Sequence, residues 1–197
     1  MTTLALLRHA PTDWNAARRL QGRADIGLSA ASRAALATRR LPAELSGFRC
    51  LVSPLLRAQE TARLLGRTAE IDLRLIEMDW GRYEGRTIAD LRREQGDAFV
   101  ANEARGLDFT PDGGESPRAV QARLDPLLAD IARRGQPTLA VTHRGVIRAI
   151  YARAIGWDMT GESPDKLDLY AMQIFTLAPG GAPRIARLNV PLEERPG

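Results

Sequence analysis

One short stretch near the start of the chain constrains the fold more than any other. The apolar run 4–7 is too brief for an independent helix, and a polar cluster with Pro11 follows it. This pattern predicts a buried strand that ends near His9. In open α/β sheets, ligands bind beyond the carboxyl ends of the strands. Arg8 and His9 are therefore expected to face a bound ligand.

The rest of the chain alternates apolar strands with helical segments. Further strands are predicted at 48–52, 69–73 and 138–142, and a closing hairpin at 170–177 and 184–190. Helices are predicted at 29–40, 53–65, 116–134 and 146–156, with another after Thr87. In two of them, Ser53-Pro54 and Ser116-Pro117 are expected to supply the N-cap and the first helical residue.

Two segments lack such a pattern. Residues 76–85 predict an irregular loop, and 96–114 a partly helical excursion or lid. Strands that alternate with helices predict an α/β fold. We expect a three-layer α/β/α sandwich with a mostly parallel mixed sheet, helices on both faces, and a single domain over 1–197.

The composition excludes several classes of protein. The net charge is +4, but the basic residues are dispersed among acidic ones, so no nucleic-acid partner is expected. No run approaches the length of a membrane span and no leader pattern is seen, so no membrane partner and a cytoplasmic location are expected. Cys50 is expected to be a buried small hydrophobe. Since Lys166 is the only lysine, almost every cation is a guanidinium, which binds phosphate or carboxylate.

The two histidines occupy matching positions, because His9 and His143 each directly follow a short apolar strand. A single histidine in such a place is more often structural, but two at equivalent strand ends converge on one crevice. Arg8 precedes the first, and Arg57 lies one turn into the helix after the second strand. Two imidazoles and two guanidiniums repel one another unless they share an anion such as a phosphoryl group.

A metal or cofactor is not expected. Two histidines without a clustered carboxylate or cysteine do not make a usual zinc site, and the chain has no phosphate-binding loop of the GxxxxGK[ST] type. Four charge-assisted donors supply the stabilisation that a metal ion gives elsewhere. A general acid is still needed, and its candidates are Glu77, Asp79 and Glu84, which share one loop.

Several motifs in order resemble the histidine phosphatase superfamily, also called phosphoglycerate mutase-like. They are Leu6-Leu7-Arg8-His9-Ala10-Pro11-Thr12-Asp13-Trp14-Asn15, Leu20-Gln21-Gly22-Arg23, Ser53 to Ala62, Glu77 to Gly85, Gly114-Glu115-Ser116 and Val141-Thr142-His143. The resemblance covers most of the chain. It implies a phosphohistidine formed on His9, with Glu77 as the proton donor.

The resemblance also assigns the remaining site residues. Arg8, Arg57 and His143 match positions that hold the phosphoryl group, and Asn15 matches a phosphate-contacting asparagine. Further candidates for substrate contact are Gln21, Gly22, Glu115 and Arg144. Arg144 departs from many relatives, which have glycine directly after the second histidine, and its side chain either narrows the pocket or contacts an anionic substrate.

The function expected from the sequence is a metal-independent phosphomonoesterase that acts on a small phosphorylated metabolite. A phosphoglycerate mutase is the first alternative, although the short 96–114 stretch offers only Arg105 where mutases have adjacent arginines. An α-ribazole phosphatase and a non-catalytic phospho-ligand-binding domain are the others. The alcohol that is released and the oligomeric state, with a homodimer as one option, stay open.

Overall fold

The sheet is built around its N-terminal strand β1 (Thr2–Arg8) in a computed structural model that describes residues 1–195. On one face of β1 lie Leu4 and Leu6 and on the other Ala5 and Leu7, all at most 1% exposed. A strand that is apolar on both faces can only lie inside a covered sheet. The pattern that predicted the strand also explains its central place.

Six strands form this sheet in the order β4-β3-β5-β1-β6-β7. Their bounds are Glu70–Ile71 for β4, Arg49–Val52 for β3, Thr138–Thr142 for β5, Met172–Leu177 for β6 and Pro183–Val190 for β7. The strands β4, β3, β5 and β1 run parallel, whereas β6 and β7 are antiparallel to their neighbours. The expected mixed, mostly parallel sheet is confirmed.

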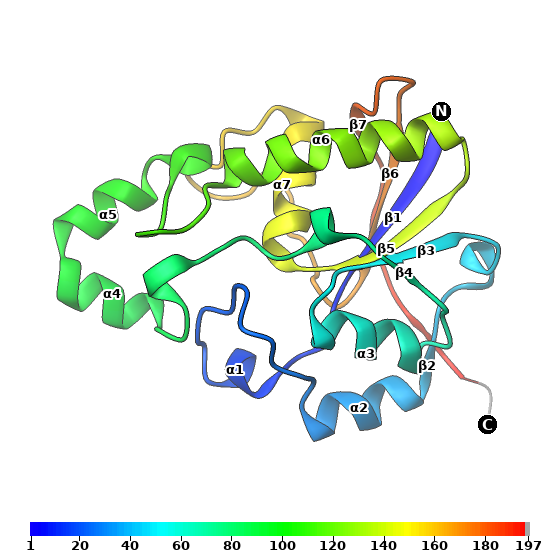
Figure 1. Cartoon of the computed structure of the whole chain (residues 1–197), viewed down its shortest axis with the longest axis horizontal. Coiled ribbons are helices and arrows are strands. Elements are labelled where there is room, and N and C mark those ends of the chain that lie inside the picture. The colour runs from blue at the N-terminus through cyan, green and yellow to red at the C-terminus, as the bar shows by residue number, and fades with distance from the viewer. Residues whose placement is uncertain (196–197) are drawn as a thin grey trace.

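Helices cover both faces of the sheet, as Figure 1 shows. On one face lie α6 (Pro117–Arg134) and α7 (Arg144–Ile155), and on the other α2 (Ala30–Ala37) and α3 (Leu56–Leu64). The apolar stripe of α6 is buried at 2% exposure or less and consists of Val120, Leu124, Leu127, Leu128 and Ile131. The three-layer sandwich follows from these two separate cores. The expected domain extends to residue 197, and its last two residues lie outside the described ones.

Three short helices lie near the carboxyl ends of the parallel strands: α1 (Asp13–Ala16), α4 (Ile88–Gln95) and α5 (Asp97–Glu103). In Figure 1, α4 and α5 project from the body of the molecule on the side of α1. Single 3-10 turns complete the connections at Ala43–Leu45, Leu73–Leu75, Gly81–Tyr83 and Gly106–Asp108. The 96–114 segment is thus partly helical, as expected.

Some predicted boundaries are wrong. The helix expected from Ser53 begins at Leu56, and Ser53 does not cap it because its hydroxyl binds elsewhere. The strand expected over 69–73 keeps two residues, since Asp72 caps the turn that starts at Leu73. The helix expected to reach 40 ends at Ala37.

A small second sheet was not predicted. It pairs β2 (Arg39–Arg40) with β8 (Glu193–Glu194). Each strand has only two residues, and ion pairs between arginine and glutamate join them. Neither strand carries an apolar pattern that would reveal it in the sequence.

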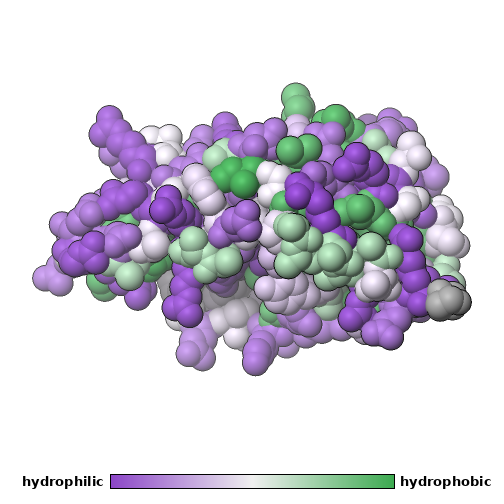
Figure 2. All heavy atoms as spheres, turned by 90° about the horizontal axis from the view of Figure 1, so that it is seen from below, coloured by the Kyte–Doolittle hydropathy of each residue, from purple (hydrophilic) through white to green (hydrophobic). Residues whose placement is uncertain are grey.

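The outer surface is mostly hydrophilic on the face seen in Figure 2, where hydrophobic side chains gather in small groups. Among the helices of residues 1–195, none combines the length and the hydropathy needed to span a bilayer.

Candidate active site

The two histidines meet because the strands before them are neighbours. His9 follows β1 and His143 follows β5, and these strands are parallel and adjacent, with Arg8 opposite Thr142. The ring centroids lie 5.1 Å apart. The predicted convergence of the two strand ends is therefore present in the structure.

His9 is held as a neutral ring with one free nitrogen. Its Nδ1 lies 2.7 Å from the carbonyl oxygen of Ala10, and since that oxygen only accepts, the proton sits on Nδ1. The lone pair is then on Nε2. Burial, followed by the charges of Arg8 and Arg57, holds the pKa of His9 well below its usual range, against the weaker effect of the Ala10 bond. A neutral imidazole is the nucleophilic form.

His143 is fully buried and oriented by Ser53, a residue that sequence reasoning assigned to a helix cap. The Ser53 hydroxyl lies 2.6 Å from His143 Nε2 and also accepts the amide of Leu55 at 3.3 Å. We assign the hydroxyl proton to Nε2, which leaves the His143 proton on Nδ1. Burial is the main cause that lowers the pKa of His143, and the charge of His9 comes next.

Arg57 is fully buried and fixed by a backbone loop. It donates to the carbonyl oxygens of Gly22 at 2.7 Å and Ala24 at 2.8 Å. Glu84 accepts the amides of the same two residues and so braces the loop. Gly22, a predicted substrate contact, thus holds Arg57 and does not line the pocket, and Glu84 is occupied as a structural group.

Glu77 is buried beside the first turn of α7. It accepts the amides of Met78 at 2.8 Å and Gly145 at 3.1 Å. Burial raises the pKa of Glu77, and these bonds and the charges of Arg57 and Arg8 oppose the rise without cancelling it. A carboxyl group with a raised pKa suits a general acid.

The other acidic candidates are placed elsewhere. Asp79 pairs with Arg23 at 3.3 Å, and Glu115 with Arg123 at 2.8 Å. Neither lines the pocket that contains Glu77.

Thr12 orients two predicted substrate contacts at once. Its backbone amide donates to Asn15 Oδ1 at 2.9 Å, and its hydroxyl lies 3.0 Å from Gln21 Oε1. Both amide oxygens are therefore occupied, and the amide nitrogens of Asn15 and Gln21 remain as donors at the pocket. The role of Thr12 was not predicted, because it depends on contacts that form only in the folded chain.

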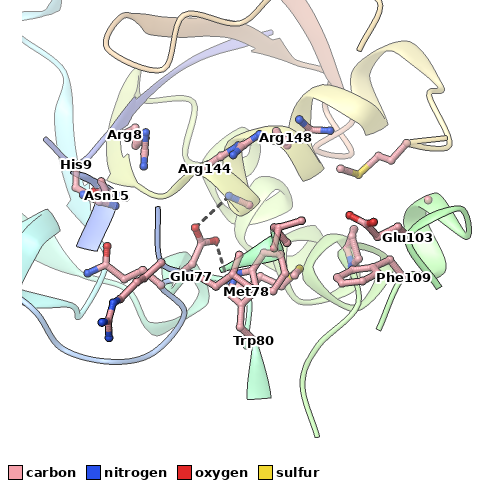
Figure 3. A pocket seen from close by; sticks show the side chains of 18 residues that line it. Arg8, His9, Asn15, Glu77, Met78, Trp80, Glu103, Phe109, Arg144 and Arg148 are labelled. Carbon is pink, nitrogen blue, oxygen red and sulfur yellow. Dashed lines mark hydrogen bonds between the residues drawn. The ribbon is translucent and has the colours of Figure 1, made fainter. Parts of the chain in front are cut away.

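The pocket has a volume of about 390 Å³. In Figure 3, His9 and Asn15 lie at one end, and Glu103 and Phe109 at the other. Arg8, Glu77 and Arg144 line the space between, while His143 and Arg57 are fully buried. Glu103 and Phe109 belong to the 96–114 segment, which therefore forms an outer wall of the site.

Four buried donors define what this site can hold. Among residues 1–195, the buried side-chain atoms without a protein hydrogen-bond partner are Arg8 Nε, Gln21 Nε2, Arg57 Nε and His143 Nδ1. All are nitrogens of predicted site residues. A buried unpaired donor costs about 1–3 kcal/mol, so a ligand with several acceptor oxygens is favoured. Across the same residues, no three histidine, cysteine, aspartate or glutamate side chains lie together as metal ligands.

The carboxyl group of Glu77 packs against Gly145, where there is no side chain. A Cβ atom at position 145 would overlap Glu77 Oε1. We expect Gly145→Ala to displace the carboxyl group and to lower kcat for phenyl phosphate roughly 100-fold. The matched control is Gly180→Ala, because a Cβ at Gly180 meets no atom within 4 Å. Equal kcat values for the two variants would show that Glu77 needs no such placement.

A model of the histidine phosphatase superfamily (branch 1) matches residues 4–191. The chain belongs to this superfamily. The solved structure of mycobacterial glucosyl-3-phosphoglycerate phosphatase in complex with VO3 has the same fold as this chain. It superimposes with a TM-score of 0.76 at 27% identity, over 96% of this chain and 100% of that one.

Proteins named for several activities resemble this chain over most of its length. Glucosyl-3-phosphoglycerate phosphatase of Mycobacterium tuberculosis is 32% identical over 76% of this chain and 73% of that protein. Metal-independent phosphoserine phosphatase of Arabidopsis thaliana is 32% identical over 78% of this chain and 68% of that protein. A 2,3-bisphosphoglycerate-dependent phosphoglycerate mutase of Nitrobacter winogradskyi is 31% identical over 94% of this chain and 91% of that protein. The expected superfamily and fold are confirmed, and the relatives named as phosphatases are consistent with the expected phosphoric monoester hydrolase.

Proposed function

We propose that this protein hydrolyses a small phosphorylated metabolite without a metal ion, through a phosphohistidine at His9. The observation that carries the proposal is the set of four unpaired buried nitrogens around a neutral His9. A phosphoryl group offers three oxygens that accept hydrogen bonds from such donors. Relatives named for glucosyl-3-phosphoglycerate and phosphoserine agree with a small substrate.

The first step forms the covalent intermediate. His9 Nε2 attacks phosphorus in line, and the bond from phosphorus to the ester oxygen breaks. Glu77 gives its proton to the departing oxygen. Arg8, Arg57 and His143 hold the phosphoryl oxygens, with the amides of Asn15 and Gln21 beside them. This places positive charge where negative charge develops in the transition state.

The second step returns the enzyme to its starting form. Water attacks the phosphorus of the phosphohistidine, and the Glu77 carboxylate takes a proton from that water. The bond between phosphorus and His9 breaks, and inorganic phosphate leaves. Glu77 is then protonated and His9 is neutral, so both groups are ready for another turnover.

Two alternatives lose support in this arrangement. Adjacent arginines in the 96–114 stretch would favour a mutase, but Arg105, the arginine of that stretch, donates to Asn102 and lies outside the pocket. A silent phosphate-binding domain needs the arginines but neither a nucleophile nor a buried acid. An α-ribazole phosphatase stays within the proposed chemistry.

As further parts of the proposal, the protein is cytoplasmic, binds neither nucleic acid nor membrane, and has a homodimer as one option.

Hydrolysis of phenyl phosphate in excess chelator tests the proposal. We expect phenol and inorganic phosphate to appear in equal amounts, with kcat unchanged by the chelator, because every proposed contact comes from a protein side chain. Loss of activity in chelator and its return with a divalent cation would contradict a metal-free mechanism. Phosphoryl transfer to an added alcohol in place of phosphate release would favour the mutase.

A further inference from the structure

Helix α7 presents two arginines to the pocket beyond the phosphoryl site. Arg144 is its first residue and Arg148 lies one turn later, about 6 Å further along the helix axis. Both line the pocket. Figure 3 shows Arg8, Arg144 and Arg148 in a row that leads away from His9.

Neither arginine has a protein partner for its charge. Within residues 1–195, Arg144 and Arg148 make no ion pair and donate no side-chain hydrogen bond. By contrast, Arg153 on the same helix pairs with Asp125 at 3.1 Å. Glu103, an acidic residue of the pocket, forms an ion pair with Arg92 at 2.8 Å. The two guanidiniums therefore remain available to an anion.

The arrangement is unfavourable without an anion. Like charges one helical turn apart repel each other. Burial, and then the charge of Arg144, lowers the pKa of Arg148. Trp157 holds the Arg148 guanidinium 5.2 Å from its ring centroid, which fixes its position but does not neutralise it.

One phosphoryl group does not need these two arginines. In the proposed mechanism its oxygens are held by Arg8, Arg57 and His143, with the amides of Asn15 and Gln21 beside them. Much of the remaining pocket lining is apolar and consists of Leu20, Met78, Trp80, Ile88, Phe109 and Met159. The pocket thus fits a molecule with a phosphoryl group near His9, an apolar carbon body, and a second anion near Arg144 and Arg148.

We propose that the substrate is a phosphomonoester whose alcohol carries a second anionic group, a carboxylate or a further phosphoryl, bound by Arg144 and Arg148. The inference rests on the proposed phosphatase function and adds the class of alcohol. Arg148 becomes a specificity-determining residue. Of the two roles that the sequence allows for Arg144, the proposal selects the contact with an anionic substrate.

Matched aryl phosphates test this inference. The wild type is assayed with 4-carboxyphenyl phosphate and with 4-carbamoylphenyl phosphate, which differ in the charge of one group. We expect Arg148→Gln and Arg144→Gln each to lower the ratio of the two kcat/KM values about tenfold or more, and the double variant further. The two esters differ in intrinsic reactivity, but this difference is the same for every variant. It therefore cancels when the ratio for a variant is divided by the wild-type ratio. Arg153→Gln is the control on the same helix, and its ratio stays at the wild-type value.

The outcomes separate this inference from the function on which it rests. An unchanged ratio in the double variant overturns the anion subsite, and so does rejection of both substituted esters by an enzyme that hydrolyses phenyl phosphate. Failure to hydrolyse phenyl phosphate itself counts against the phosphatase mechanism instead. A third ester, 1,4-phenylene bisphosphate, identifies the anion: faster hydrolysis than the carboxylate indicates a phosphoryl group, and slower hydrolysis a carboxylate.

Discussion

Replacement of His9 by alanine is expected to lower kcat for phenyl phosphate by at least about 10⁴-fold, the scale seen when a covalent nucleophile is removed. His143 cannot replace His9 as the nucleophile, because its Nε2 faces Ser53 and its ring is fully buried. The remaining arginines still bind an anion but cannot form the intermediate. The measurement is phosphate release by the purified variant.

Binding of inorganic phosphate provides the control for His9→Ala. The donors Arg8 Nε, Arg57 Nε and Gln21 Nε2 do not depend on His9, so phosphate is expected to raise the melting temperature of the variant as it does that of the wild type. A variant that binds phosphate but is inactive has lost only its nucleophile. Activity within tenfold of the wild type would exclude His9 from the chemistry.

Replacement of Glu77 by glutamine is expected to slow hydrolysis of phenyl phosphate by about 10²–10⁴-fold, the usual contribution of a general acid. Glutamine keeps the size of the side chain, and its oxygen can still accept the amide of Gly145 or Met78. The loss in kcat/KM, which reports only the first step, is expected to be smaller with 4-nitrophenyl phosphate, because its more acidic phenol needs less help to leave. Equal losses in kcat/KM with both esters would contradict the role of proton donor.

The pH dependence of kcat/KM follows from the same two groups. His9 must be neutral, so activity falls as the pH drops through the pKa of His9, which burial holds well below its usual range. Glu77 must be protonated, so activity also falls as the pH rises through the pKa of Glu77, which burial raises. We expect a bell-shaped profile with its maximum on the acidic side. In Glu77→Gln the alkaline limb should vanish, and its persistence would assign that limb to another group.

The central fold was predictable because its signals are local. Residues 4–7 and 139–141 are apolar on both faces, which only a covered parallel strand explains. The cap of α6 at Ser116 and its apolar stripe were readable in the same way. The two-residue strands β2 and β8 were not, since they pair residues about 150 positions apart and have no apolar pattern.

The site was predictable where topology alone decides it. His9 and His143 meet because parallel neighbours end at one edge of the sheet. Ser53, Thr12 and Arg148 were missed because their roles depend on contacts across the fold. For Arg148 one signal was present in the sequence: it lies four residues after Arg144 and therefore shares its face of the helix.

Mass spectrometry of the Glu77→Gln variant during turnover of 4-nitrophenyl phosphate tests the phosphohistidine most directly. The acidic phenol leaves without the general acid, whereas the second step lacks its base, so the intermediate accumulates. We expect one phosphoryl group for each chain, stable to alkali, lost in acid and located on His9. Steady release of nitrophenol from a chain that carries no phosphoryl group, or one that carries it on another residue, would contradict the mechanism.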